Sequence, residues 1–480
     1  MIRRQTLYLA LVLSGLTAVV SAATIRIPGD GATIQDGIDL AVSGDTVLVA
    51  PGRYTENLNF RGKGILLTSR FLTSEDPADI AATIIDGSAP THPDTASCVL
   101  FINGEDSSAI LQGFTLTGGT GTRWPDIHIG GYYREGGGIL IELASPTIRF
   151  NRITGNVAID RSGVTSAGGG GIRCGDGNPR ITNNVIIENE GRYGGGIVLN
   201  YSGGVIRNNV IARNTGGQDF GGAGIWAYEN GPAEKIITNN TIAVNQSLGS
   251  GIYGGKGGGM LVWATTVVGL NNIVWGNTQT TGSPIHRIQA SVQFRFSDVE
   301  GGFGGDGNLD IDPVFATSSF LLSPGSPCID SGDSSATQQD QEDPAQPGQA
   351  LWPSQGTVRN DMGAYGGPFA APLPDFATTD VETGSPLPDR FTMGLNYPNP
   401  FNPNTTIAFS LPEKSRATLT IYNILGHSVA RLVDDVMSPG AYTVQWDGRN
   451  HDGLAAASGV YFYRLSAGPF TATRRMVLLR

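Results

Sequence analysis

The chain has 480 residues, a formal net charge of −11 and 69 glycines, and only 15% of its residues are charged. The glycines follow no three-residue period and the apolar residues form no heptads, which excludes collagen and a coiled coil. The acidic balance argues against nucleic acid as a general partner. Abundant glycine with few charges predicts an all-β protein with many tight turns.

The N-terminus has the features of an export signal. Arg3 and Arg4 precede an apolar stretch over residues 7–20, and small residues follow at Val20-Ser21-Ala22. This order predicts a secretory signal peptide over residues 1–22. The alternative is a membrane anchor, but the stretch is short for a span, and no later apolar run predicts a transmembrane domain. The three cysteines, Cys98, Cys174 and Cys328, are far apart and predict buried free thiols.

A repeat dominates the middle of the chain. A glycine run followed by a short apolar strand occurs five times, and each copy is followed by two asparagines at a fixed offset. The first asparagines of these pairs are Asn151, Asn184, Asn209, Asn240 and Asn272, and the second are Asn156, Asn189, Asn214, Asn245 and Asn277. Such spacing predicts a parallel β-solenoid whose turns are held by asparagine ladders. The alternative is a set of unrelated strands in a sandwich.

Alternation within each copy indicates which side chains face the interior. In Ile225-Trp226-Ala227-Tyr228, period two places Ile225 and Ala227 on one face. The equivalent inward pairs in the other copies are Ile139/Ile141, Ile172/Cys174, Ile197/Leu199 and Met260/Val262.

Motifs at both ends of this region resemble a known class. The segments 24–30, 32–39, 44–49, 51–57 and 62–65 resemble the entry of right-handed parallel β-helix proteins of the pectate-lyase-like class, which includes pectin methylesterases. The segments 297–301, 310–313, 323–330 and 361–365 resemble the final coils of secreted bacterial members. The resemblance implies a right-handed parallel β-helix over residues 23–367.

The catalytic motifs of that class do not carry over. The paired Asp and Gly-His-Gly of polygalacturonases are absent, and residues 218–221 match only part of the Asp-Phe-Ile-Phe-Gly element of pectin methylesterases. Whether the chain is an enzyme is therefore left open, and no resident cofactor is expected.

Residues 368–390 are rich in proline and predict a linker. Alternating runs separated by Asp-Gly turns then predict a small Ig-like β-sandwich over residues 391–480. The segments 396–403, 446–448, 458–461 and 474–480 resemble the C-terminal sorting domain of type IX-secreted proteins and the Ig-like domain of flagellar hook-capping proteins. This resemblance implies export and surface attachment, with the secretion machinery as a partner.

Two sets of side chains predict a glycan-binding surface. Arg149 and Arg207 take equivalent repeat positions, and guanidinium groups suit the carboxylates or sulfates of an acidic polysaccharide. Trp226, Tyr228 and Trp263 are expected to point outward on adjacent coils, where sugar rings could pack on them. We expect the two sets to form one extended track. The alternatives are solvated arginines and aromatic rings covered by a loop.

An insertion at residues 120–135 is the loop richest in reactive side chains. Its candidate catalytic residues, for a lyase acting on an acidic glycan, are Arg123, Asp126, His128, Tyr133, Arg134 and Glu135. A weak calcium site is conceivable at Asp306, Asn308, Asp310 and Asp312, although turn formation accounts for them more simply.

The sequence as a whole predicts a secreted, surface-attached β-helix protein that binds a polysaccharide or another surface. The alternatives are a polysaccharide lyase or hydrolase and a structural envelope protein.

Overall fold

The computed structural model describes residues 22–250, 252–316, 319–373, 391–393, 396, 399–412, 415–437, 440–451 and 453–479. Residues 1–21 of the predicted signal peptide and residues 374–390 of the predicted linker lie outside these residues. The chain divides into two compact units, Met1–Thr378 and Thr379–Arg480. No helix in the described part is long and apolar enough to cross a membrane.

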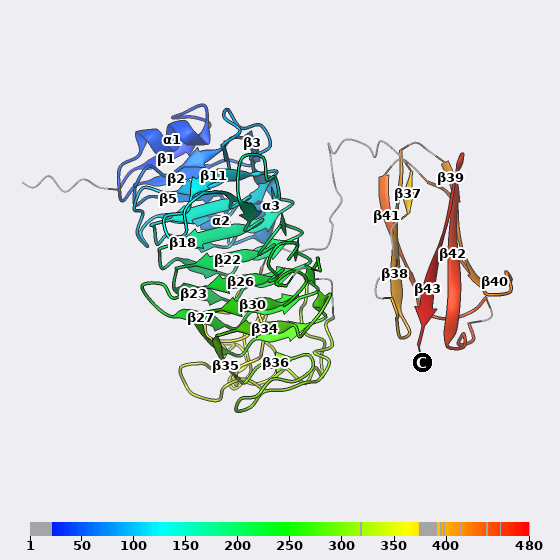
Figure 1. The fold of residues 1–480 in the computed structure, drawn as a ribbon. Coiled ribbons are helices and arrows are strands. Elements are labelled where there is room, and N and C mark those ends of the chain that lie inside the picture. Colours follow the sequence, from blue (N-terminus) through cyan, green and yellow to red (C-terminus); the bar gives the residue numbers. More distant parts are fainter. Residues whose placement is uncertain are drawn as a thin grey trace, which may run out of the picture. The chain divides into compact units, whose positions relative to one another are not determined.

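The first unit is a parallel β-helix, in which successive coils stack from β1 to β36 (Figure 1). Three long parallel sheets form its sides. The ten-stranded sheet contains β1 (Thr24–Ile27), β2 (Thr46–Val49), β5 (Leu66–Ser69), β9 (Ile110–Gln112), β14 (Thr147–Arg149), β19 (Arg180–Thr182), β23 (Gly204–Arg207), β27 (Lys235–Thr238), β31 (Thr266–Leu270) and β35 (Ser291–Arg295). The nine-stranded sheet contains β3 (Gly52–Thr55), β6 (Thr83–Asp86), β10 (Thr115–Thr117), β15 (Arg152–Thr154), β20 (Val185–Ile187), β24 (Val210–Ala212), β28 (Thr241–Ala243), β32 (Ile273–Trp275) and β36 (Asp298–Val299).

The eight-stranded sheet forms the third side and contains β4 (Leu58–Asn59), β8 (Val99–Phe101), β13 (Ile139–Glu142), β18 (Ile172–Gly175), β22 (Ile197–Asn200), β26 (Ile225–Tyr228), β30 (Met260–Trp263) and β34 (Ile285–Ile288). A five-stranded sheet of two-residue strands runs along one turn and contains β16 (Val157–Ala158), β21 (Glu190–Gly191), β25 (Thr215–Gly216), β29 (Gln246–Ser247) and β33 (Thr278–Gln279). A four-stranded sheet outside the coils contains β7 (Thr95–Ala96), β11 (Gly121–Pro125), β12 (Tyr132–Glu135) and β17 (Ser166–Gly168).

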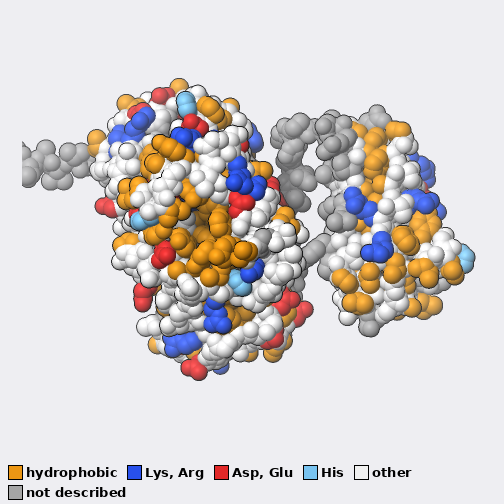
Figure 2. All heavy atoms as spheres, viewed as in Figure 1, with side chains coloured by type: hydrophobic (Ala, Val, Ile, Leu, Met, Phe, Trp, Pro, Cys, Tyr) orange, Lys and Arg blue, Asp and Glu red, His pale blue; other side chains and the backbone are white. Residues whose placement is uncertain are grey.

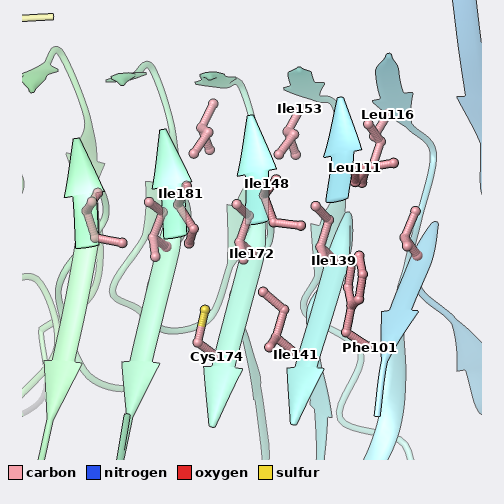
Figure 3. Close-up of a cluster of buried hydrophobic side chains, with 14 of the residues drawn as sticks. Phe101, Leu111, Leu116, Ile139, Ile141, Ile148, Ile153, Ile172, Cys174 and Ile181 are labelled. Carbon is pink, nitrogen blue, oxygen red and sulfur yellow. The ribbon is translucent and has the colours of Figure 1, made fainter. Parts of the chain in front are cut away.

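The interior is a stack of mostly aliphatic side chains that each coil contributes from all three sheets. Ile139, Ile172, Ile197 and Ile225 are paired in register and fully buried, as the alternation predicted. Figure 3 shows such columns between the sheets, with Ile148 and Ile181 from one sheet facing Ile141 and Cys174 from another. A coil buries this face only against its neighbours, so the core is continuous along the stack.

The predicted asparagine ladders are present at two positions of every central coil. From Asn184 and Asn189 onward, each ladder side chain accepts from the ladder Asn of the preceding coil. Each also donates to a strand carbonyl of the preceding coil; Asn209 Nδ2, for example, donates to Ile181 O at 2.8 Å. The residue before each first-ladder Asn has a positive φ, such as 52° at Asn208. That left-handed residue makes the bend between the ten- and nine-stranded sheets. The ladder supplies hydrogen-bond partners for the backbone N–H and carbonyl groups that lose their strand partners at the bend.

Helix α1 (Ile34–Leu40) covers the N-terminal end of the core. Thr33 and Asp36 form a capping box, and Ile34 and Ile38 are buried against Ile27 and Val47. Two short helices, α2 (Phe71–Ser74) and α3 (Pro77–Ala82), lie in the connection between β5 and β6.

The segment after β36 folds differently from the prediction. Among its described residues, a single parallel bridge joins Leu309 to Asp298 of β36, and no further strand is added to the three long sheets. The segment packs Phe320, Ala364 and Tyr365 onto the outer face of the nine-stranded sheet. Asn183 Nδ2 donates to Phe369 O at 2.9 Å, and Leu373 is buried in the same cluster. The first residues of the predicted linker, 368–373, therefore belong to the β-helix unit.

The second unit is the predicted antiparallel β-sandwich. One sheet contains β37 (Thr392–Met393), β38 (Thr405–Leu411) and β41 (Gly440–Trp446), and the other contains β39 (Ser415–Asn423), β40 (Ser428–Met437), β42 (Gly459–Ala467) and β43 (Phe470–Leu478). Both sheets contribute to one core, with Ile407 and Trp446 from the first and Leu419, Tyr463 and Met476 from the second. This core is separate from that of the β-helix.

Candidate functional site

The outer face of the eight-stranded sheet carries a cluster of aromatic rings, the aromatic face. Two outward columns run across its coils, Val198–Trp226–Leu261 and Asn200–Tyr228–Trp263. Rings from turns and neighbouring coils join them, so that the aromatic face consists of Tyr201, Phe220, Trp226, Tyr228, Tyr253 and Trp263. Figure 2 shows hydrophobic side chains gathered over β22, β26 and β30.

The rings of this face differ in exposure. Trp226 points out of the coil but is only 4% exposed, because Tyr193 and Phe220 pack on it and its Nε1 donates to Asn200 Oδ1 at 2.8 Å. The expectation of an exposed Trp226 is therefore wrong. Tyr228 and Trp263 are half-buried, with ring centroids 5.5 Å apart, so both residues are partly exposed to solvent.

The insertion at 120–135 is a β-hairpin of β11 and β12 rather than an irregular loop. Asp126 Oδ1 accepts from the backbone N–H groups of His128 and Ile129, which fixes the hairpin turn. His128 stacks on Tyr201 with centroids 3.6 Å apart, and its Nε2 lies 2.9 Å from Asp176 Oδ1. The hairpin tip is thereby joined to the aromatic face.

A small pocket of about 60 Å³ lies under the hairpin, and we call it the hairpin pocket. It is lined by side chains of the hairpin and of the strands below, and its members are Trp124, Pro125, Asp126, Ile127, His128, Glu142, Leu143, Arg173 and Asp176. Arg123 turns away from this set and stacks on Tyr132, with its guanidinium carbon 3.4 Å from the ring centroid.

A buried charge network forms the floor of the hairpin pocket. Arg173 Nε lies 2.8 Å from Glu135 Oε2, its Nη1 donates to Glu142, and Tyr193 Oη donates to Glu135. Burial raises the pKa of Glu142 to about 8, against the opposing charge of Arg173. Burial opposes the charge of Arg173, but the two carboxylates outweigh it and raise the pKa of that guanidinium. One cation thus serves two carboxyl groups, and Glu142 holds its proton near neutral pH.

The structure separates the six candidate catalytic residues into groups. Asp126 and His128 line the hairpin pocket, whereas Glu135 lies below it in the network with Arg173. Arg134 is buried and donates to Pro93 O at 2.9 Å and Gly121 O at 3.1 Å, which gives it a structural role. Tyr133 packs beside the aromatic face, and burial raises its pKa. The six candidate residues therefore do not converge on one site.

The predicted arginine and aromatic sets do not form one track. Arg149, Thr182 and Arg207 are in register, as predicted, but they lie on the ten-stranded sheet. Trp226 and Trp263 lie on the eight-stranded sheet, on another side of the β-helix. Neither arginine is fully solvated: Arg149 Nε donates to Gln112 Oε1 at 2.7 Å, and Phe369 stacks on Arg207.

Three of the four candidate calcium residues use a side-chain oxygen to accept a backbone hydrogen bond. Asn308 Oδ1 accepts from Ser297 N, Asp310 Oδ1 from Gly301 N and Asp312 Oδ1 from Val314 N. Within the described ranges, no group of three or more His, Cys, Asp and Glu side chains is placed to hold a metal ion.

Sequence reasoning missed the strand residues under the hairpin. Glu142, Arg173 and Asp176 carry the charges of the site, and Tyr201 and Tyr253 add rings to the aromatic face. Glu142 and Arg173 are outward positions of β13 and β18, where the other copies carry apolar or amide side chains. Charged residues at such positions, beside a long insertion, were the available signal.

Comparison with known families agrees with this architecture. A family model described as the right-handed β-helix region matches residues 133–294, and that of the FlgD Ig-like domain matches residues 400–468. No curated protein matches the chain. The fold and these matches define a right-handed parallel β-helix followed by an Ig-like domain.

Solved structures with similarity to the chain include a surface component of the type IX secretion system, PorZ of Porphyromonas gingivalis. It is 19% identical over 26% of this chain, with a TM-score of 0.15, and only 14% of PorZ is covered. Two pectin methylesterase structures with bound hexasaccharides are also similar. One is 11% identical, with 64% of this chain and 98% of that one covered and a TM-score of 0.34. The other is 10% identical, with 59% and 80% covered and a TM-score of 0.26.

Proposed function

We propose that the protein binds a polysaccharide on its aromatic face. The observation that carries the proposal is the pair of open, half-buried rings, Tyr228 and Trp263, set in a larger ring cluster and adjoining the polar hairpin pocket through Tyr201 and His128. Sugar rings present C–H faces that pack on aromatic rings, while hydroxyl and carboxylate groups need polar partners beside them.

The rigidity of the face favours binding by a preformed surface. Trp226 anchors the cluster from below through its bond to Asn200, and the rings above it are held by β26 and β30 in a continuous sheet. Little side-chain entropy is lost when a ligand covers rings that are already fixed. Because coils repeat along the stack, a chain-like ligand would meet equivalent positions on successive coils.

A glycan array followed by titration of the best ligands tests this proposal. Tyr228→Ala with Trp263→Ala should weaken binding about 5- to 150-fold, because alanine at two ring contacts removes about 1–3 kcal/mol. Trp352→Ala is the matched control, because Trp352 is 61% exposed and belongs to the segment after β36. Equal losses in the two variants would contradict the proposal.

The hairpin pocket supports a second candidate, cleavage of a polysaccharide. A carboxyl group that holds its proton near neutral pH suits a general acid, and the His128–Asp176 pair supplies a base beside it. Glu142→Gln should then abolish the formation of new reducing ends, or of an unsaturated product that absorbs light. Glu188→Gln, at a half-exposed residue, should not. Absence of any product from the wild-type protein across acidic and neutral glycans would remove this candidate.

We also propose that the protein is exported and held at the bacterial cell surface through its Ig-like domain. The support is the set of motifs in residues 396–480, together with the apolar N-terminal stretch that resembles a signal peptide. A chain truncated after residue 378 should keep the folded β-helix, since the two cores are separate, but should no longer reach the surface of a host with the matching export system. Surface delivery of the truncated chain would contradict the proposed role.

A further inference from the structure

A second pocket lies on the outer face of the ten-stranded sheet, whereas the aromatic face lies on the eight-stranded sheet. We call this second pocket the Arg207 pocket. Its volume is about 240 Å³. The strands β23 and β27 form its floor and the segment after β36 forms its wall, and its lining residues are Val205, Arg207, Ile236, Thr238, Asn239, Thr337, Gln338, Pro368 and Phe369.

The guanidinium group in this pocket lacks an anionic partner. Among the described residues, the charged group that acts on Arg207 is the cation Arg180 and not a carboxylate, and Arg207 Nε is buried without a hydrogen-bond acceptor. Burial lowers the pKa of Arg207, and the neighbouring charge that adds to this shift is another cation, Arg180. An arginine stays protonated in a protein, so an unpaired, half-buried charge remains that an anion would stabilise.

The rest of the pocket supplies apolar surface next to that charge. Val205 and Ile236 line it, and the ring of Phe369 lies 3.6 Å from the guanidinium carbon of Arg207. The side chain of Thr238 adds a hydroxyl. This combination fits a compact ligand that has an anionic group on one side and a ring face on the other.

The wall of the pocket is held in place by the bends of successive coils. Asn183 Nδ2 donates to Phe369 O at 2.9 Å, Asn208 Nδ2 donates to Gly366 O at 2.7 Å, and Asn239 Nδ2 donates to Asn360 Oδ1 at 3.0 Å. These three side chains come from consecutive coils, so the pocket is preformed rather than dependent on a ligand for its shape.

We propose that the Arg207 pocket binds a single acidic sugar unit, a uronate or a sulfated sugar, with its anionic group on Arg207 and a face of its ring against Val205 and Ile236. The site is independent of the aromatic face, because it uses another sheet and none of the same residues.

Titration of the full-length protein with glucuronate, glucose and inorganic sulfate at low ionic strength tests the proposal. Glucuronate should bind, glucose should bind at least about tenfold more weakly, and sulfate alone should also be weaker because it lacks the ring contact. Equal binding of glucuronate and glucose would overturn the proposal. Sulfate binding as tight as that of glucuronate would overturn the sugar assignment and leave a general anion site.

Matched variants locate the binding. Arg207→Gln should weaken glucuronate binding about tenfold or more, and Arg207→Lys should restore only part of it, since lysine lacks the planar fork. Arg149→Gln is the control, because Arg149 lies in the same column but is already bonded to Gln112. Phe369→Ala, which leaves the strand surface unchanged, should also weaken binding. Full binding by Arg207→Gln and Phe369→Ala, or equal loss in Arg149→Gln, would overturn the assignment.

The Tyr228→Ala with Trp263→Ala variant separates this inference from the proposed function. It should bind glucuronate as the wild type does, even where its affinity for a polysaccharide has fallen. Loss of glucuronate binding in that variant would place the acidic sugar on the aromatic face and overturn the Arg207 pocket.

Discussion

Asn209 and Asn240, on adjacent coils, are joined twice: the backbone N–H and the Nδ2 of Asn209 both donate to Asn240 Oδ1, at 3.0 Å each. The side chain of Asn209 in turn accepts from Asn184. Every ladder amide therefore uses both its donor and acceptor groups in the interior, where water cannot replace them.

Replacing one ladder residue should destabilise the β-helix. Asn209→Ala leaves the backbone N–H of Asn184 and the carbonyl of Ile181 without their partners, at a cost of about 1–3 kcal/mol in the free energy of unfolding. Asn103→Ala, at an exposed position, should cost less than about 0.5 kcal/mol. Chemical denaturation compares the two, and equal shifts would contradict a structural role for the ladder.

The ladder also shows what could be predicted from the sequence. Two asparagines at a fixed offset, in each of five copies, define the turn between two sheets, and strict alternation defines which residues of each strand face inward. Both patterns depend only on local geometry and the stacking of identical coils, so the coil architecture and the inward residues, such as Ile225 and Ala227, were predicted correctly.

The errors arose where nonrepeated segments cover the coils. Trp226 is an outward residue, but turns of unequal length bring Phe220 and Tyr193 over it, and no periodic pattern encodes that coverage. The prediction that Arg207 and Trp226 lie on one track was wrong for a different reason. Arg207 precedes a ladder Asn and Trp226 follows the next glycine run, so the two lie on different sides of the β-helix, which the repeat itself indicated.

The stability of the β-helix should fall as the pH rises from about 4 to about 8. Burial, with Asp361 nearby, raises the pKa of Asp340 to about 8, and burial raises that of Asp361 to about 7. In the unfolded chain these groups ionise near pH 4, while the folded protein still holds their protons, so the folded state binds more protons across this range and loses stability with increasing pH.

Thermal unfolding at pH 5 and pH 8 measures this effect. The melting temperature should be higher at pH 5, and Asp340→Asn should reduce the difference, because the amide has no proton to lose. Asp306→Asn, at an exposed position, should leave the difference unchanged. A wild-type melting temperature that rises from pH 5 to pH 8 would contradict the burial of protonated carboxyl groups in this segment.

Removing the Arg173 guanidinium group under the hairpin should strongly destabilise the β-helix. Arg173→Leu leaves Glu135 and Glu142 buried without their shared partner, at a cost of about 3–5 kcal/mol. The loss should be smaller at pH 5 than at pH 8, because burial raises the pKa of Glu142 and its protonation removes one of the buried charges. Arg61→Leu, which breaks an exposed pair with Asp39, should cost less than about 1 kcal/mol. A loss for Arg173→Leu that is small and independent of pH would show that the network carries no buried charge.

Binding of a polysaccharide by the aromatic face is tested most directly by affinity electrophoresis in gels that contain the polysaccharide ranked first by the array. The wild-type protein and the Trp352→Ala control should be retarded equally, while the Tyr228→Ala with Trp263→Ala variant should migrate as in a gel without polysaccharide, with an unchanged melting temperature. Equal retardation of all three proteins would show that the polysaccharide binds elsewhere and would contradict the proposed function.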